Sequence, residues 1–234
     1  MTRVVAVLPA LDEADALPAA LDGAPVWLEI VVVDNDSRDG TAEVARRLGA
    51  RVVHEPFRGY GAAVQRGLQA ASGADIVVVL DADATFDWDD LPALLEPLHT
   101  GTADVVLGRR IARRHEPGAM LWHVAVANAV LGWLCGLIAR VRLHDLAPFR
   151  AIRGDVIATI GAVDRTYGWP LEFVLRAAHA GLRIREVDVA YRVRAGVSKV
   201  TGRPGPTLKA AVRMLGVLWR HMTARRAVPS LERS

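Results

Sequence analysis

The chain has few cysteines, lysines and aromatic residues, and each shortage removes a class of function. Cys135 is the only cysteine among 234 residues, which excludes a disulfide framework and a cysteine-rich metal site. Aromatic residues make up 6% of the chain and no nucleic-acid-binding signature is present, so we expect no nucleic-acid partner. Residues 4–8 form an apolar strand pattern instead of a secretory signal, and we expect a cytoplasmic protein.

Positive charge comes almost entirely from arginine, because Lys199 and Lys209 are the only lysines. A guanidinium group offers phosphate a fixed fork of donors, which an ammonium group does not. The arginines cluster in the second half of the chain, although the net charge is only +3. Such clusters are either solvated basic faces or sites for an anionic partner. For this composition, anionic lipid or a diphosphate substrate fits better than nucleic acid.

Short β-branched runs alternate with helical patterns along the first half of the chain. These segments are residues 4–8, 13–21, 29–33, 41–48, 51–54, 61–71 and 75–80. Apolar strands separated by helices predict βαβ units and a mostly parallel sheet with helices on both faces. The expected fold class is therefore α/β and Rossmann-like, with a large core for which the 52% hydrophobic composition is sufficient.

Polar residues follow three of the predicted strands, at 9–13, 34–40 and 81–85. Ligands of such sheets bind at the carboxyl ends of the strands, so these segments are expected to meet in one crevice. The most informative segment is Asp81-Ala82-Asp83, because paired carboxylates suit Mg²⁺ or Mn²⁺, which complete their shells with water and substrate phosphates. Alone, the pair is equally typical of a turn. The context favours a divalent cation and a phosphorylated substrate.

Two apolar segments lie in the second half. Residues 119–139 contain His123 and Asn128 as their only polar groups, a length that just suffices to span a bilayer. The flanking arginines favour a helix that lies in the membrane interface or packs on the domain over one that spans. Residues 207–221 carry apolar side chains at helical spacing, which predicts a second amphipathic helix.

In combination, seven motifs resemble a known family. The motifs are Pro9-Ala-Leu-Asp-Glu13, Val33-Asp-Asn-Asp-Ser-Arg-Asp-Gly-Thr41, Gly59-Tyr-Gly-Ala-Ala63, Leu80-Asp-Ala-Asp83, Asp145-Leu-Ala-Pro-Phe-Arg150, Tyr167-Gly-Trp-Pro-Leu-Glu172 and Arg194-Ala-Gly-Val-Ser-Lys199. The first four resemble inverting glycosyltransferases of family 2, which have the GT-A fold. The last three resemble the branch of dolichyl-phosphate mannosyltransferase and other polyprenyl-phosphate glycosyltransferases.

The resemblance implies a division of the chain. Residues 1–205 would form the GT-A domain, with a nucleotide-sugar-binding half at 1–108 and an acceptor-binding half at 109–205. Residues 206–234 would form a C-terminal helix and tail.

The resemblance also implies donor-binding residues. They are Pro9, Leu11, Glu13, Asp34, Gly59, Gly61, Asp81, Ala82, Asp83, Arg194 and Lys199, with the metal on Asp81 and Asp83. Asp12 replaces the family's asparagine before Glu13, and Thr85 replaces a glutamine whose metal-binding place its hydroxyl can take through a water. Gly59 and Gly61 would let backbone approach the ligand at a helix N-terminus, or simply form a turn. Asp87, Asp89 and Asp90 are expected to cap a helix over residues 91–98.

For the acceptor, the resemblance implies Arg110, Arg114 and Ser198 as phosphate-binding residues. Asp83, Glu172 and Lys199 are the candidate catalytic residues. Glu172 occupies the place of a general base in enzymes with hydroxyl acceptors. A phosphate acceptor is already an anion and needs no such base.

Three functions remain open. The leading hypothesis is metal-dependent transfer of a hexose, with inversion, from GDP-mannose or UDP-glucose to a polyprenyl phosphate, by a protein peripheral on the inner face of the cell membrane. The second is transfer to a hydroxyl of a small molecule or glycan, with Glu172 as base. The third is a non-catalytic nucleotide-sugar-binding protein on the membrane surface.

Overall fold

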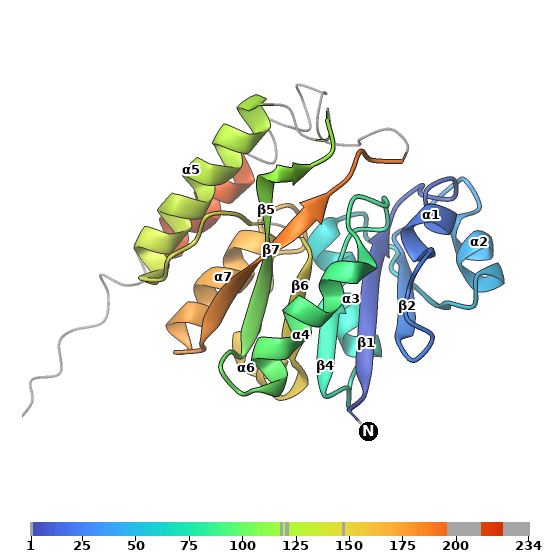
Figure 1. Ribbon diagram of the computed structural model, residues 1–234, viewed down its shortest axis with the longest axis horizontal. Helices are drawn as coiled ribbons and strands as arrows, with labels where there is room; N and C mark the ends of the chain where they lie inside the picture. The colour runs from blue at the N-terminus through green and yellow to red at the C-terminus, as the bar shows by residue number, and fades with distance from the viewer. Residues whose placement is uncertain (1, 118, 120–121, 147, 196–211, 222–234) are drawn as a thin grey trace, which may run out of the picture.

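The computed structural model describes residues 2–117, 119, 122–146, 148–195 and 212–221, and its centre is one mostly parallel sheet (Figure 1). In these residues seven strands lie in the order β3-β2-β1-β4-β6-β5-β7, and only β6 runs antiparallel to its neighbours. The strands are β1 (Val4–Ala10), β2 (Glu29–Asp34), β3 (Arg51–His54), β4 (Ile76–Val79), β5 (Val105–His115), β6 (Arg150–Arg153) and β7 (Ile184–Tyr191).

Helices cover both faces of the sheet because the central strands are apolar on both sides. Along β1, Val4, Ala6 and Leu8 point into one core with α1, α2 and α4, while Val5 and Val7 point into another with α3, α5 and α7. The helices are α1 (Leu17–Leu21), α2 (Thr41–Arg47), α3 (Tyr60–Ala70), α4 (Leu91–His99), α5 (Trp122–Ala139), α6 (Ile157–Ile160) and α7 (Trp169–His179). Two 3₁₀ turns, η1 (Trp88–Asp90) and η2 (Gly154–Val156), and a C-terminal helix at residues 212–221 complete the described elements.

The predicted α/β sheet with helices on both faces is confirmed. Residues 51–54 form a strand with the predicted bounds. The helix predicted over 13–21 is shorter, because the backbone N–H groups of Ala16 and Leu17 both bond to the Glu13 carbonyl in a turn, and α1 starts only at Leu17. Both predicted halves contribute strands to the same sheet, since β4 from the first half pairs with β6 from the second.

The two predicted apolar helices are α5 and the C-terminal helix, and both pack on the side of the sheet that α7 covers. α5 buries Cys135 and Ala139, and the C-terminal helix buries Val217 and Leu218 in the same core. Burial raises the pKa of the Cys135 thiol to about 12, as expected for a core cysteine. Within the described part of the chain, no helix has both the length and the hydropathy needed to cross a membrane.

Asp104 ties together the three strands of the second half at the amino end of β5. Its carboxylate accepts hydrogen bonds from Arg183 Nε at 2.9 Å and Nη2 at 2.8 Å, and from Arg153 Nη1 at 3.0 Å. The Arg183 hydrogen bonds are the main reason that the pKa of Asp104 is lowered to about 2. One carboxylate thereby joins β6, β5 and the approach to β7.

We expect Asp104→Asn to lower the free energy of unfolding at pH 7 by about 1–2 kcal/mol, after allowance for solvent screening of the arginines. The pKa of Asp104 in the folded chain lies below its ordinary value. Its ionised form therefore stabilises the fold at pH above about 4, and this contribution disappears as the pH falls toward 2. Urea denaturation across this pH range measures the effect, with the exposed Glu43→Gln as control. A loss that stays constant down to pH 3 would contradict the ionic origin.

Candidate active site

A cleft of about 540 Å³ opens where β1, β2 and β4 end. It brings together most of the side chains predicted to bind the donor: Pro9, Leu11, Glu13, Gly59, Asp81, Ala82, Asp83 and Arg194. Arg110, predicted for the acceptor, also lines it. Ser198 and Lys199 lie outside the described residues.

Asp81 and Asp83 place two carboxylates at the end of the buried strand β4. Asp83 is fixed from one side by Thr85, whose Oγ1 donates to Asp83 Oδ1 at 2.6 Å and whose N–H donates to the same oxygen at 3.2 Å. Ala84, between Asp83 and Thr85, has a φ of 62°, a left-handed conformation that is uncommon outside glycine. Burial, and then the charge of Asp83, raise the pKa of Asp81 to about 7. The two aspartates thus form a compact, repelling acidic pair.

Arg194 lies against this pair from the other side of the cleft. Its Nη1 is 3.1 Å from Asp83 Oδ2, and its Nη2 binds Glu13 Oε1. The next residue continues the contact, because the Ala195 N–H donates to the Asp83 carbonyl at 3.1 Å. Arg194, which was predicted to bind the donor, therefore lies beside the acidic pair, and its guanidinium acts as the counter-ion of Asp83.

Arg110 is a second cation of the cleft, and it is held rigidly. Its Nε and Nη2 donate to the two oxygens of Asp145, both at 2.7 Å, and its guanidinium lies over the Tyr191 ring at 5.1 Å. The Asp145 hydrogen bonds raise the pKa of Arg110 further above its ordinary value, against the opposing effect of its burial. A fixed, permanently charged guanidinium of this kind suits an anionic ligand.

Asn35 joins the loop after β2 to the loop before α3. Its Nδ2 donates to the Glu55 and Phe57 carbonyls at 3.0 and 2.6 Å, and its Oδ1 accepts from the Gly59 N–H at 2.8 Å. Arg58 adds a contact from its Nε to Asp36 at 2.8 Å. Asn35 and Arg58 both line the cleft, yet neither was among the predicted site residues. The sequence feature that could have identified Asn35 as a site residue is its position directly after Asp34, at the end of a strand.

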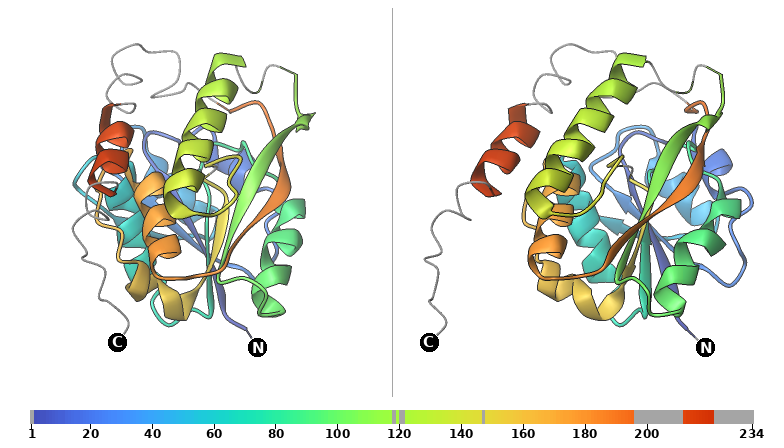
Figure 2. Two further views of the ribbon diagram at one scale, coloured as in Figure 1. Left: turned by 90° about the vertical axis from the view of Figure 1, so that its left-hand side faces the viewer. Right: turned by 60° about the vertical axis from the view of Figure 1, so that its left-hand side comes forward.

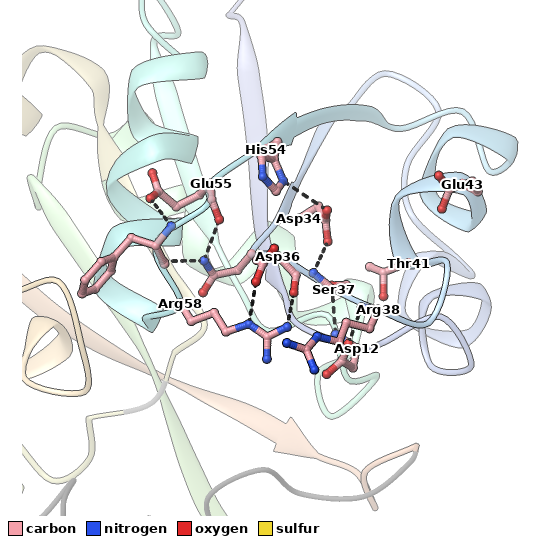
Figure 3. Close-up of polar contacts among 12 residues, drawn as sticks. Asp12, Asp34, Asp36, Ser37, Arg38, Thr41, Glu43, His54, Glu55 and Arg58 are labelled. Carbon is pink, nitrogen blue, oxygen red and sulfur yellow. Dashed lines mark hydrogen bonds and ion pairs between the residues drawn. The ribbon is translucent and has the colours of Figure 1, made fainter.

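Asp34 lies just beneath this loop and is buried. Its Oδ1 accepts from the Ser37 N–H at 3.2 Å, and its Oδ2 is 3.4 Å from His54 Nδ1 (Figure 3). Asp12, which replaces the family's asparagine, has a carboxylate that accepts from the Arg38 N–H at 2.7 Å. The acid at position 12 therefore joins the loops after β1 and β2, a task for which an acceptor is needed.

The first turn of α3 is not open for an anion, in contrast to the expectation from Gly59 and Gly61. The Gly61 and Ala62 N–H groups donate to the carbonyls of Thr166 and Arg165 at 3.2 and 2.9 Å. A Cβ on Gly61 would lie 2.0 Å from the Asp164 carbonyl oxygen, and one on Gly59 would lie 2.3 Å from that of Arg165. The two glycines let α3 pack against the turn before α7.

Glu172 does not line the cleft. It is buried in the first turn of α7, where its Oε2 accepts from the Val163 and Asp164 N–H groups at 3.0 and 2.5 Å and its Oε1 accepts from Arg176 Nε at 3.1 Å. Oε2 thus holds the turn against which Gly61 packs, and Oε1 is paired with Arg176 one turn further along α7. The geometry gives Glu172 a structural task and does not place it for proton removal from an acceptor.

Three further expectations are corrected by the contacts. Arg114 does not line the cleft, because its Nη2 binds Asp90 at 2.7 Å and its Nη1 donates to the Asp188 carbonyl at 2.9 Å. Asp90 therefore does not cap α4, while Asp87 caps η1 by accepting from the Asp89 N–H at 3.1 Å. The Thr85 hydroxyl is buried against Asp83 and so orients that carboxylate directly.

The donor set at the acidic pair fits a hard divalent cation. No group of three or more histidine, cysteine, aspartate or glutamate side chains is arranged for a metal in the described residues, so the protein can offer two carboxylates. Two carboxylates are enough for Mg²⁺ or Mn²⁺, because these ions complete their coordination shells with waters and with phosphate oxygens of the substrate. The repulsion within the pair favours such an ion.

Comparison with known proteins identifies the family of this chain. Residues 5–162 match the family described as Glycosyl transferase family 2. The chain belongs to this family. The glycosyltransferase is 46% identical over 202 residues to an uncharacterized glycosyltransferase of Mycobacterium tuberculosis, which covers 85% of this chain and 90% of the relative.

Two other relatives of this glycosyltransferase have more specific names. A dolichyl-phosphate hexose transferase of Haloferax volcanii is 35% identical over 173 residues, 74% of this chain and 73% of the relative. An undecaprenyl-phosphate mannosyltransferase of Micrococcus luteus is 31% identical over 221 residues, 86% of this chain and 88% of the relative.

Among solved structures, the glycosyltransferase is similar to glucosyl-3-phosphoglycerate synthase of Mycobacterium tuberculosis in complex with phosphoglyceric acid. The TM-score is 0.71 at 26% identity, over 94% of this chain and 80% of the other. The same enzyme in complex with Mn²⁺, uridine diphosphate and glucosyl-3-phosphoglycerate gives a TM-score of 0.69 at 26% identity, with the same coverage. The predicted GT-A fold and the predicted enzyme class are confirmed.

The packing of α3 on the turn before α7 can be tested by Gly61→Ala. The added methyl group would overlap backbone that cannot move away cheaply, so we expect a loss of about 2–4 kcal/mol in the free energy of unfolding. Gly216→Ala in the C-terminal helix is the matched control. Its Cβ meets nothing within 4 Å, and it should be neutral or stabilise by up to ~1 kcal/mol. Equal stability of the two variants in urea would contradict this packing.

Proposed function

We propose that this glycosyltransferase transfers a hexose from a nucleoside diphosphate sugar to a polyprenyl phosphate, with inversion at the anomeric carbon, at the surface of the cell membrane. The observation that carries the proposal is the composition of the cleft. Its acidic pair, Arg110 and Arg194 suit the diphosphate and phosphate groups of the two substrates, and the apolar part of its lining suits a hydrocarbon chain.

The donor is proposed to bind at the loops after β1, β2 and β4. Asn35 and Arg58 would adjoin its nucleoside, and Asp81 and Asp83 would hold the divalent cation. When bound, this ion neutralises the charge of the diphosphate leaving group. The Mn²⁺ and uridine diphosphate bound to the similar synthase support a divalent cation and a uridine nucleotide as first candidates. Mg²⁺ and Mn²⁺ are both candidates for the ion of this chain.

The acceptor is proposed to enter between the later elements of the chain. There the cleft is lined by Ala119 before α5, Leu146 and Pro148 before β6, Pro170 of α7 and Met214 of the C-terminal helix. These side chains offer an isoprenoid chain an apolar path, and Arg110 offers its phosphate a fixed cation. The names of the Haloferax and Micrococcus relatives support a polyprenyl phosphate.

The chemistry asked of the chain is then positioning and charge compensation. The acceptor phosphate is already an anion, so it attacks the anomeric carbon without a base. Arg110 orients it, and Arg194 is near enough to the acidic pair to pass from Asp83 to the departing diphosphate. Lys199 and Ser198, outside the described residues, are proposed to add phosphate contacts.

A second candidate is transfer to a hydroxyl of a small phosphorylated acid, as the name of the structurally similar synthase suggests for that protein. The sequence led us to expect Glu172 as the base for this reaction. Its carboxylate is engaged in other contacts and buried away from the cleft, which counts against hydroxyl transfer with Glu172 as base. We therefore place it second. A non-catalytic role is set aside by membership of an enzyme family with a complete acidic pair.

The metal proposal predicts opposite effects of two substitutions on Mn²⁺ binding to the nucleotide-free chain, read by electron paramagnetic resonance. Asp81→Asn removes a ligand and should abolish binding, while Arg194→Ala removes a competing cation from Asp83 and should tighten it several-fold. Both should lower hexose transfer by about 10²-fold or more. Tighter binding in Asp81→Asn, or full transfer in EDTA, would contradict the proposal.

The acceptor proposal predicts radiolabelled transfer from a nucleotide sugar to undecaprenyl or dolichyl phosphate in detergent, and none to 3-phosphoglycerate. Glu172→Gln should retain catalysis with the lipid in whatever fraction folds, because its carboxylate holds a turn and does not meet the acceptor. Rate per folded molecule is the quantity to compare. Transfer to 3-phosphoglycerate that disappears in Glu172→Gln would establish the second candidate instead.

A further inference from the structure

Two helices that contribute residues to the cleft also present apolar side chains to solvent. On α5 these are Val126, Val130, Trp133 and Leu137, which recur at one face of the helix. On the C-terminal helix they are Val212, Leu215 and Trp219. The two tryptophans are among the most exposed, at 62% for Trp133 and 68% for Trp219. Figure 2 shows the two helices side by side on the same outer side of the domain. We name these seven side chains the two-helix surface.

The exposure does not come from loose packing of the helices. Each has an opposite face in the core, with Cys135 buried on α5 and Val217 on the C-terminal helix. Arg213 Nε also binds the buried Asp164 at 2.7 Å, which fixes the C-terminal helix to the turn before α7. The two-helix surface is therefore a group of exposed apolar side chains on two anchored helices, and grouped exposed apolar side chains mark interaction sites.

The charged residues in the two stretches of sequence that contain these helices are all basic. The sequence has no aspartate or glutamate between residues 117 and 144 or between 189 and 231, two stretches that include both helices. Arg140 and Arg142 are exposed at the end of α5, and Arg220 is about half-exposed beside Trp219. Apolar side chains with two tryptophans and flanking arginines are the combination that binds the interface of an anionic bilayer.

The surface is continuous with the proposed entry of the acceptor. Asn128 of α5 and Met214 of the C-terminal helix both line the cleft, so the same two helices carry the two-helix surface outside and part of the cleft wall inside. A second copy of the chain would fit less well, because a symmetric contact brings like surfaces together and would oppose arginine to arginine.

We propose that the two-helix surface docks this glycosyltransferase on an anionic lipid bilayer, with Trp133 and Trp219 in the headgroup region. The inference rests on the proposed lipid acceptor and names the surface from which that acceptor enters the cleft. Docking is a property of the exposed side chains alone and can be measured without substrate, metal or turnover.

Co-sedimentation of the full chain with vesicles tests the docking. The wild-type chain should bind phosphatidylglycerol–phosphatidylcholine vesicles, and W133S/W219S should bind them roughly tenfold more weakly or worse. Trp27→Ser is the matched control, because Trp27 is 56% exposed and belongs to the loop before β2, a segment that lies far from α5 in Figure 1, so its loss should leave binding unchanged. Equal binding of the wild type and W133S/W219S would overturn the proposal.

The arginines give a second arm. R140Q/R142Q should lose most of the preference for anionic over pure phosphatidylcholine vesicles, and the wild type should lose it at high salt. Light scattering at several protein concentrations tests the alternative that a second copy of the chain covers the two-helix surface. A dimer that W133S/W219S dissociates, in a chain that ignores vesicles, would overturn the proposal in favour of a second copy.

Transfer assays separate this proposal from the proposed function. W133S/W219S should transfer hexose to polyprenyl phosphate normally in detergent and poorly on vesicles. Normal transfer on vesicles would overturn the docking surface and leave the acceptor in place. Absence of lipid transfer by the wild type in either medium, with vesicle binding intact, would overturn the acceptor alone.

Discussion

The repulsion between two carboxylates at the end of β4 is the constraint on which the site depends. Asp81 and Asp83 are kept close by a buried strand, and Thr85 fixes one of them. Their charge has to be balanced, and Arg194 contributes to this from a segment more than a hundred residues later. The acidic pair therefore explains why residues far apart in the sequence meet at one edge of the sheet, and why a cation and a diphosphate are suitable ligands there.

The loops around the pair are held in conformations that need support. Asp12, Asp36 and Ala84 have φ values of 51°, 63° and 62°, and each lies in a loop that follows one of the strands β1, β2 and β4. Such residues persist only where surrounding contacts determine them. Here the contacts are side chain to backbone, as between Asn35 and the loop before α3. Rigidity at the edge of the cleft thus comes from polar ties, while rigidity beneath it comes from the two apolar cores.

The sequence could predict what local pattern determines. Apolar runs identified the parallel strands, and the polar residues after them identified Asp81, Asp83 and Glu13 as neighbours. It could not predict tertiary partners: nothing local shows that Gly61 faces a carbonyl of the turn before α7, or that Glu172 holds that turn. Both have the residue type and position of a functional group. The carbonyl that faces Gly61 lies about a hundred residues away in the sequence, and the N–H groups that bind Glu172 lie nine residues away or fewer. Both sets of partners belong to the turn before α7, which has no recognisable sequence pattern.

The antiparallel strand β6 has a consequence for how the two substrate-binding halves relate. It enters between β4 and β5, so one edge of β4, the strand that leads into the acidic pair, is covered by the half of the chain that we propose to contact the acceptor. Without the second half, one edge of β4 would therefore be unpaired. A chimera that joins the first half of one relative to the second half of another at residue 108 would also replace the strand that pairs with β4. In this fold, acceptor preference can diverge through helices and loops such as α5 more readily than through replacement of a module.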